Sequence, residues 1–145
     1  QGKVSQTDIE TVIHAEIEKY RMKFKDSEEG LIKSWPSSYT IRGWLVSMQS
    51  GGKLAPHIHE IGWITGSVYI RVPPKSMTDD GSLVLCLNDH DCSFGREKSQ
   101  QSVIDVMTGS LCLFPASLHH YTIPFGGEED RIVLAFDVIP KTLAN

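Results

Sequence analysis

Two histidines, His57 and His59, are separated by a single residue in the segment 56–59. On a β-strand, residues i and i+2 point to the same face, so the two imidazoles would lie side by side. Neutral imidazole binds zinc, copper, iron and nickel, and such a pair is therefore a candidate for part of a transition-metal site. Two surface histidines in a loop would show the same spacing, so the pair gains meaning only from residues elsewhere.

A second pair of histidines, His119 and His120, follows an extended segment much further along the chain. Only the fold can bring the two pairs together. A small β-barrel has an interior just wide enough to hold one ligand, and could do so. The elements that would position the four histidines therefore decide whether a site exists.

Length and composition place the chain among ordinary globular proteins. Its 145 residues correspond to one domain that can bury a core, with 40% hydrophobic and 22% charged residues. The net charge is −4 without a cluster of Lys or Arg, which argues against nucleic acid as a partner. No apolar run approaches the roughly 18 residues that a membrane span requires.

The chain has three cysteines, Cys86, Cys92 and Cys112. Their number is odd and their spacing matches no zinc motif. We interpret them as free thiols in a reducing compartment, which predicts a cytoplasmic protein.

The first predicted element is a helix over residues 8–24. Thr7 fits the N-cap position, with Glu10 as the reciprocal partner of a capping box. Apolar residues then recur at helical spacing: Ile9, Val12, Ile13, Ile17, Tyr20 and Phe24. This stripe predicts that the helix packs on the rest of the fold.

After residue 39 the apolar periodicity changes to two, and Gly and Pro separate about eight short extended segments. These are 41–48, the segment with His57 and His59, 64–72, 82–87, 103–106, 109–114, 121–123 and 131–139. A helix followed by many short strands predicts a mainly β fold, an antiparallel barrel or jelly roll with an N-terminal α-helix.

The spacing around both histidine pairs resembles the two motifs of the cupin superfamily. Gly51 precedes His57 by five intervening residues, and the second segment reads Gly109, Pro115, Ser117 and His120 at matching intervals. The resemblance implies a double-stranded β-helix and selects His120, rather than His119, as a third metal ligand.

A more extensive resemblance covers roughly residues 35–140. It is carried by Trp35-Pro36, Gly43-Trp44, Gly51-Gly52, residues 56–59, Gly62-Trp63, Thr65-Gly66, Tyr69, Pro73, residues 114–120, residues 123–125, Arg131-Ile132 and Phe136-Asp137. In these positions the chain resembles a family of 2-oxoglutarate-Fe(II) oxygenases, whose members often lie C-terminal to tetratricopeptide repeats. We accordingly expect residues 1–30 to pack as a helix and lead-in on a jelly-roll oxygenase-like domain, 31–145.

The family resemblance implies the roles of individual residues. It places His57, His59 and His120 at Fe(II). It makes Arg131 the cation for the distal carboxylate of 2-oxoglutarate, with Tyr69 as a second cosubstrate contact. From composition alone, Arg131 could instead pair with acidic residues 128–130 and Tyr69 could simply pack in the core. Trp63 is close enough to the ligands in sequence to shape a substrate pocket.

The ligand set has one unusual feature. Most oxygenases of this type bind iron through two histidines and one carboxylate. With His59 in place of the carboxylate, three neutral ligands would leave the iron with one more net positive charge. Glu60 follows directly, but on a continuing strand it would face away from His57. His90, between Asp89 and Asp91, could form a second metal site, although a solvated polar loop is the simpler interpretation.

The implied activity is that of an iron- and 2-oxoglutarate-dependent dioxygenase, an oxidoreductase that hydroxylates a substrate. The sequence does not identify that substrate, and a protein side chain and a small molecule both remain open. Two alternatives remain beside it: a cupin-type metal-dependent dioxygenase or isomerase that does not use 2-oxoglutarate, and a catalytically silent metal-binding barrel. A homo-oligomer is compatible with the sequence but not required by it.

Overall fold

The computed structural model describes residues 5–87, 92 and 101–141. These begin with helix α1 (Gln6–Lys23) and the short helix α2 (Gly30–Lys33). The strands that follow are β1 (Tyr39–Met48), β2 (Leu54–His57), β3 (Ile64–Arg71), β4 (Leu83–Cys86), β5 (Gln101–Ile104), β6 (Leu111–Pro115), β7 (His119–Thr122) and β8 (Arg131–Pro140). His90 and its acidic neighbours, which were interpreted as a solvated polar loop with a second metal site as the alternative, lie outside the described residues.

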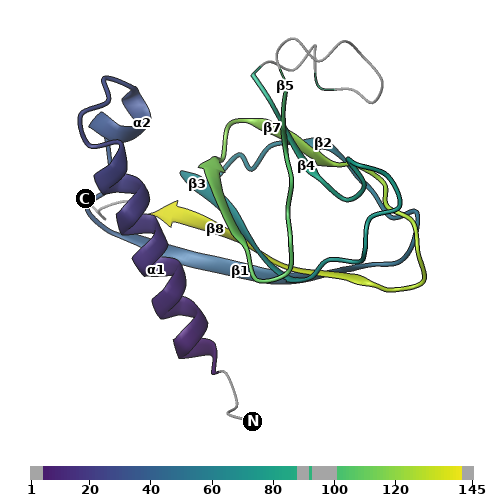
Figure 1. The fold of residues 1–145 in the computed structure, drawn as a ribbon. Coiled ribbons are helices and arrows are strands. Elements are labelled where there is room, and N and C mark those ends of the chain that lie inside the picture. Colours follow the sequence, from purple (N-terminus) through teal and green to yellow (C-terminus); the bar gives the residue numbers. More distant parts are fainter. Residues whose placement is uncertain (1–4, 88–91, 93–100, 142–145) are drawn as a thin grey trace.

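The strands form two four-stranded sheets with the orders β1-β8-β3-β6 and β2-β7-β4-β5 (Figure 1). Each of the neighbouring pairs is antiparallel. The sheets face each other, since one internal cavity is lined by side chains from β1, β3 and β8 on one side and from β2 and β7 on the other. This arrangement confirms the predicted mainly β jelly roll with an N-terminal helix.

Strand β8 lies in the interior of the first sheet, between β1 and β3. Its side chains alternate between two environments, as the pleat of a strand requires. Phe136 and Val138 are fully buried with Ile13 and Ile17 of α1, in a cluster outside the sheet. The intervening residues point inward, toward the second sheet. The strand therefore connects the helix-covered core to the cavity.

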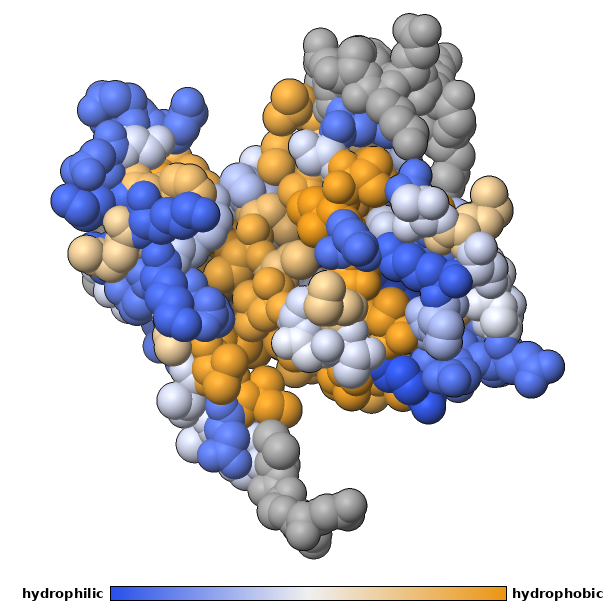
Figure 2. Space-filling view, in the orientation of Figure 1, coloured by the Kyte–Doolittle hydropathy of each residue, from blue (hydrophilic) through white to orange (hydrophobic). Residues whose placement is uncertain are grey.

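Helix α1 packs on the outer face of this sheet through the predicted apolar stripe (Figure 1). Ile13 and Ile17 are buried, whereas Val12 and Phe24 remain exposed, so the stripe is narrower than its sequence suggests. Figure 2 shows apolar side chains gathered in the region between the helix and the strands. Burial of this face, rather than intrinsic helix propensity, is what stabilises most helices in proteins.

The N-cap of α1 corrects the prediction. The cap residue is Ser5, whose hydroxyl accepts from the backbone N–H of Asp8, while the Asp8 carboxylate accepts from the Ser5 N–H at 2.9 Å. Thr7 instead lies within the first turn, where its carbonyl accepts the Thr11 hydroxyl at 2.8 Å. Two candidate capping boxes overlap in the sequence, and the one that starts earlier forms.

The cysteines also depart from the prediction. Cys86, at the end of β4, forms a disulfide with Cys92, with the two Cα atoms 5.5 Å apart. Cys112 is free, as expected. The interpretation of all three as free thiols was therefore wrong for two of them. Among the described helices, none is long and apolar enough to cross a membrane.

Candidate metal centre

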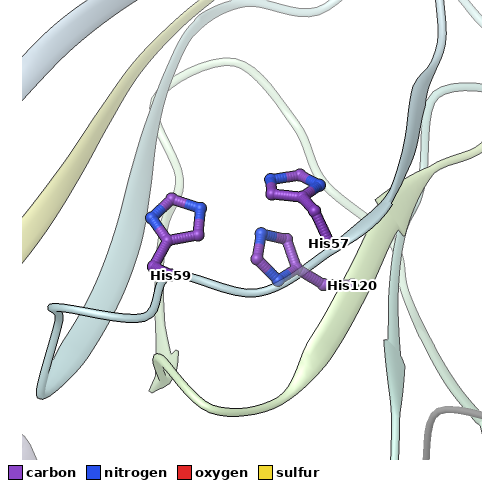
Figure 3. Close-up of side chains that lie close together, drawn as sticks. All are labelled: His57, His59 and His120. Atoms are coloured by element: carbon purple, nitrogen blue, oxygen red, sulfur yellow. The ribbon is translucent and has the colours of Figure 1, made fainter.

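The side chains of three histidines, His57, His59 and His120, lie close together (Figure 3). The nearest ring nitrogens of His57, His59 and His120 all lie within 4.8 Å of one another. Separations of this size allow one ion to contact all three side chains. The structure thus brings together the three residues predicted from the two motifs.

Strand pairing accounts for two of these positions. His57 is the last residue of β2, and it lies directly opposite His120 of β7 in the antiparallel register. Side chains of directly opposed residues point to the same face of a sheet and come close together. The two ring centroids are 4.3 Å apart.

His59 is positioned differently, because β2 ends at His57. Its backbone N–H donates to the Ala116 carbonyl at 3.0 Å, and its own carbonyl accepts from Gly62 at 3.1 Å. A Cβ at position 62 would lie only 2.9 Å from the Ala116 Cβ, so glycine permits this close approach of the chain. The expectation that one strand presents both histidines was therefore wrong for His59, although the two rings still converge.

Each of the three imidazoles has an oxygen acceptor at Nδ1. His57 Nδ1 lies 2.8 Å from the Ala55 carbonyl, and His120 Nδ1 lies 3.0 Å from the Leu118 carbonyl. His59 Nδ1 lies 2.6 Å from a carboxylate oxygen of Asp137. A carbonyl or carboxylate oxygen can only accept, so Nδ1 must carry the proton in each ring. Each Nε2 is then left with a free lone pair for a metal, a common arrangement around histidine ligands.

The protonation state of His120 fits this role. The pKa of the His120 imidazole is lowered from 6.5 to about 4, mainly by burial; the Leu118 carbonyl opposes this change, and the neighbouring His57 and His59 contribute smaller decreases. The ring is therefore neutral near pH 7, as a metal ligand must be.

The cavity has a volume of about 130 Å³, and both the three histidines and Arg131 line it. Its lining comprises Trp44, Val46, Met48, Leu54, His57, His59, Thr65, Gly66, Ser67, Tyr69, Leu83, Phe114, His120, Thr122, Arg131, Val133 and Ala135. The metal-binding side chains and one cation thus share an otherwise largely apolar enclosure.

Arg131 is a buried cation, with only 2% of its surface exposed. Its guanidinium donates to the Gly81 carbonyl at 3.1 Å and to the Thr122 hydroxyl at 3.5 Å. The buried Nε–H has no hydrogen-bond partner, and no carboxylate of a described residue forms an ion pair with this side chain. Burial lowers the pKa of Arg131. A buried, unpaired guanidinium calls for an anionic ligand, and the surface ion pair considered as an alternative is not formed.

Tyr69 lies beside this cation, with the guanidinium carbon 5.2 Å from its ring centre. Burial raises the pKa of the Tyr69 phenol, so the group is a neutral hydroxyl. The ring also belongs to a buried apolar cluster with Leu83, Val106 and Phe114. The structure therefore places Tyr69 both in the core and at the cavity wall.

Trp63 is not brought into the cavity. It is half-buried and packs against the cluster between α1 and the first sheet. Trp44 of β1 lines the cavity instead and stacks on the His59 ring, with centroids 5.6 Å apart. Trp44 lies directly opposite Ala135 of β8 in the sheet. Its place on the inner face follows from that register, which the sequence alone does not reveal.

Asp137 is the second residue that sequence reasoning left without a role. Asp137 lies six residues after Arg131 on β8. Because side chains alternate along a strand, the predicted strand 131–139 would have put both residues on one face. Glu60, the carboxylate considered near the ligands, is exposed and does not belong to the group of metal-binding side chains found among the described residues.

Comparison with known protein families identifies the chain. Residues 42–137 match the sequence model of a family described as "Putative 2OG-Fe(II) oxygenase". This chain belongs to that family. The matched segment includes all three histidines, Tyr69, Arg131 and Asp137. The predicted family is therefore confirmed, and its description names Fe(II) and 2-oxoglutarate, the two predicted cofactors.

Solved structures share the fold of this oxygenase family member. A prolyl-4-hydroxylase from Pseudomonas putida superposes with a TM-score of 0.57 and 12% identity, over 98% of this chain and 70% of that one. An oxidoreductase of the 2OG-Fe(II) oxygenase family from Burkholderia pseudomallei superposes with a TM-score of 0.54 and 14% identity, over 86% of this chain and 53% of that one. HygX from Streptomyces hygroscopicus, with nickel and 2-oxoglutarate bound, superposes with a TM-score of 0.51 and 17% identity, over 72% of this chain and 58% of that one.

The chain spans about half of the Burkholderia pseudomallei structure's length. Among curated proteins, no relative matches the sequence.

Proposed function

We propose that this protein is an iron- and 2-oxoglutarate-dependent dioxygenase that hydroxylates a C–H bond of its substrate. His57, His59 and His120 hold Fe(II) through their Nε2 atoms, and Arg131 binds the distal carboxylate of 2-oxoglutarate. The observation that carries the proposal is the combination, within one small cavity, of three converging imidazoles and a buried arginine that lacks an anionic partner. When bound, Fe(II) and 2-oxoglutarate would supply the oxidising chemistry with O₂ as the oxidant: the cosubstrate loses CO₂ and takes one oxygen atom to become succinate, and the other oxygen atom enters the C–H bond of the substrate.

In this proposal the residues of this chain bind and orient the metal and the cosubstrate. The three imidazoles are fixed by their Nδ1 contacts, so the donor atoms are arranged before the metal arrives. Arg131 offers a planar donor group that matches a carboxylate, and its unpaired Nε–H would gain a charge-assisted hydrogen bond. The neutral Tyr69 hydroxyl lies beside that position and adds a further donor.

The cavity wall near the metal ligands suggests what part of a substrate can react. Trp44 and Leu54 line the cavity and are 37% and 38% exposed, so both are accessible from outside. Apart from Arg131, which the cosubstrate occupies in this proposal, the lining offers no other Lys, Arg, Asp or Glu. We infer that the reacting part of the substrate is uncharged and apolar.

Oxygen-free titration tests the proposal. Purified protein is loaded with Fe(II), and 2-oxoglutarate is added while the visible spectrum is recorded. The chelated cosubstrate is expected to give a charge-transfer band, and, after admission of air, candidate substrates are screened for stimulated succinate release. Absence of both the band and cosubstrate binding by wild-type protein would refute the proposal.

One observation favours a second candidate, a cupin-type dioxygenase or isomerase that binds its substrate directly on the metal. It is the donor set itself, which consists of three histidines without a carboxylate. The same titration separates the two, because this second enzyme would bind metal but show no affinity for 2-oxoglutarate. A barrel that binds both without any turnover would correspond to the non-enzymatic alternative.

Location and assembly remain predictions. The cytoplasmic assignment relied on free thiols, and the Cys86–Cys92 disulfide removes that argument, since disulfides persist mainly in oxidising compartments. A homo-oligomer, and the division into a lead-in 1–30 and a barrel 31–145, likewise remain predictions.

A further inference from the structure

Asp137 lies directly behind one of the three proposed metal ligands. Its carboxylate is 8% exposed and its Oδ1 atom is 2.6 Å from His59 Nδ1. Thr65, directly opposite Asp137 on β3, places its hydroxyl oxygen 3.4 Å from the same nitrogen. That hydroxyl donates its proton to the Phe136 carbonyl at 3.1 Å, so it can only accept from the ring. Both neighbours therefore favour the tautomer with the proton on Nδ1.

His59 depends on these neighbours more than the other two histidines do. It lies beyond the end of β2, whereas His57 and His120 are paired residues of a sheet. Asp137, by contrast, is fixed within the interior strand of the opposite sheet. The ring of His59 is thus held between the Asp137 carboxylate at one edge and the stacked Trp44 on its face.

No Lys or Arg among the described side chains forms an ion pair with Asp137, whose close partner is the imidazole of His59. Arg42 lies directly opposite on β1, but it is exposed and forms no ion pair with Asp137. A buried carboxylate without a cation is costly unless hydrogen bonds or a metal compensate it. The Asp137 carboxylate faces the imidazole of His59. That imidazole would lie between the carboxylate and a bound metal cation, so the negative charge would act on the cation through the ring.

We propose that Asp137 is a positioning residue that supplies, from outside the ligand set, the negative charge that a three-histidine centre lacks. Two histidines and a carboxylate would leave a bound Fe(II) with a net charge of +1, whereas three neutral imidazoles leave +2. Asp137, which contacts the imidazole of His59, returns the net charge of the metal, the three histidines and this carboxylate together to +1. It also fixes the donor direction of His59, and the inference rests on the proposed function.

The experiment compares wild-type protein with Asp137→Asn, Asp137→Ala and Glu60→Gln. Asparagine keeps the shape and an acceptor oxygen but removes the charge. Glu60→Gln removes an exposed carboxylate one residue from His59, and so serves as a matched control for the loss of a nearby charge. Co(II) affinity is measured by visible absorption, and the midpoint potential of the Fe(III)/Fe(II) couple by redox titration.

We expect both Asp137 variants to bind Co(II) about 10- to 100-fold more weakly, as is usual when a carboxylate partner of a ligating histidine is removed. The Fe(III)/Fe(II) potential should rise in Asp137→Asn, because loss of a negative charge disfavours the more highly charged ion. Glu60→Gln should change the affinity by less than about twofold.

The outcomes separate this inference from the proposed function. Wild-type protein that binds neither Co(II) nor Fe(II) would overturn both. Wild-type binding with an unchanged affinity in Asp137→Asn would overturn the role of Asp137 alone, as would a weakened affinity with an unchanged potential. Should Asp137→Ala fail to fold, the isosteric asparagine variant decides. In wild-type protein loaded with Zn²⁺, ¹⁵N NMR of the imidazoles must show the proton of His59 on Nδ1.

Discussion

The two faces of β8 have opposite characters. The outer face carries Phe136 and Val138, both fully buried against apolar side chains of α1 and β3. The inner face carries Arg131 at the start of the strand and Asp137 six residues further along, with Val133 and Ala135 between them. Both charged groups are buried, and neither has an ion-pair partner of the usual Lys–Asp or Arg–Glu kind among the described residues.

The difference shows how one strand can serve stability and chemistry at once. The outer face stabilises the fold without any ligand, since its apolar side chains are covered by other apolar side chains. The inner face leaves a guanidinium nitrogen without a hydrogen-bond partner and a carboxylate in contact with an imidazole rather than with Lys or Arg. Such groups lower stability unless a ligand completes them, so the inner face is organised for a metal and an anion rather than for folding.

Phe136→Ala should give the largest effect on stability. Removal of a fully buried aromatic ring leaves a cavity and typically costs about 3–5 kcal/mol. Urea unfolding of the metal-free protein would measure the loss, and Phe136→Leu should lose less. At temperatures where the variant is folded, its Co(II) affinity should match that of wild type. A large fall in affinity without a loss of stability would contradict the division between the two faces.

Arg131→Met should have the complementary result. Loss of the buried cation is expected to weaken 2-oxoglutarate binding by about 2–5 kcal/mol, or roughly 30-fold and upward. Co(II) affinity should be retained, because Arg131 does not belong to the group of metal-binding side chains. Arg131→Lys keeps the charge without the planar donor group, so its affinity for 2-oxoglutarate should lie between those of wild type and Arg131→Met. Isothermal titration with 2-oxoglutarate provides the measurement, and equal affinities in all three proteins would exclude Arg131 from the cosubstrate site.

Acidification should destabilise the metal-free protein through His120. Its pKa is about 4 in the folded state and about 6.5 in the unfolded chain, so the unfolded state binds an extra proton between these values. Stability is therefore full above about pH 6.5 and falls as the pH drops toward 4, by roughly 3 kcal/mol in total. Urea midpoints recorded across this range should depend less on pH in His120→Asn. The same pH dependence in both proteins would count against a buried neutral His120.

Much of the fold was predictable, because its signals are local. The change of apolar period near residue 39 and the frequent Gly and Pro predicted short antiparallel strands, and the observed strands lie close to the predicted ones. The convergence of His57, His59 and His120 was implied by the resemblance of their surrounding motifs to those of known families. These features depend on which residues occupy a strand and how far apart they lie, and the sequence states both.

Other features depend on pairing between distant segments. His59 leaves the strand because β2 ends where His57 meets His120. Trp44 lines the cavity and Trp63 does not, since Trp44 follows the alternation of β1 while Trp63 precedes the start of β3. The bond between Asp137 and His59 joins residues 78 positions apart. Alternation from Arg131 could have indicated the face of Asp137, but not its partner.

A crystal structure of the protein with Fe(II) and 2-oxoglutarate, grown without oxygen, tests the central claim most directly. The account predicts that Nε2 of His57, His59 and His120 binds the metal, that Arg131 contacts the distal carboxylate, and that Asp137 stays on Nδ1 of His59. A metal bound by Asp137 or Glu60 in place of His59, or 2-oxoglutarate bound away from Arg131, would contradict it.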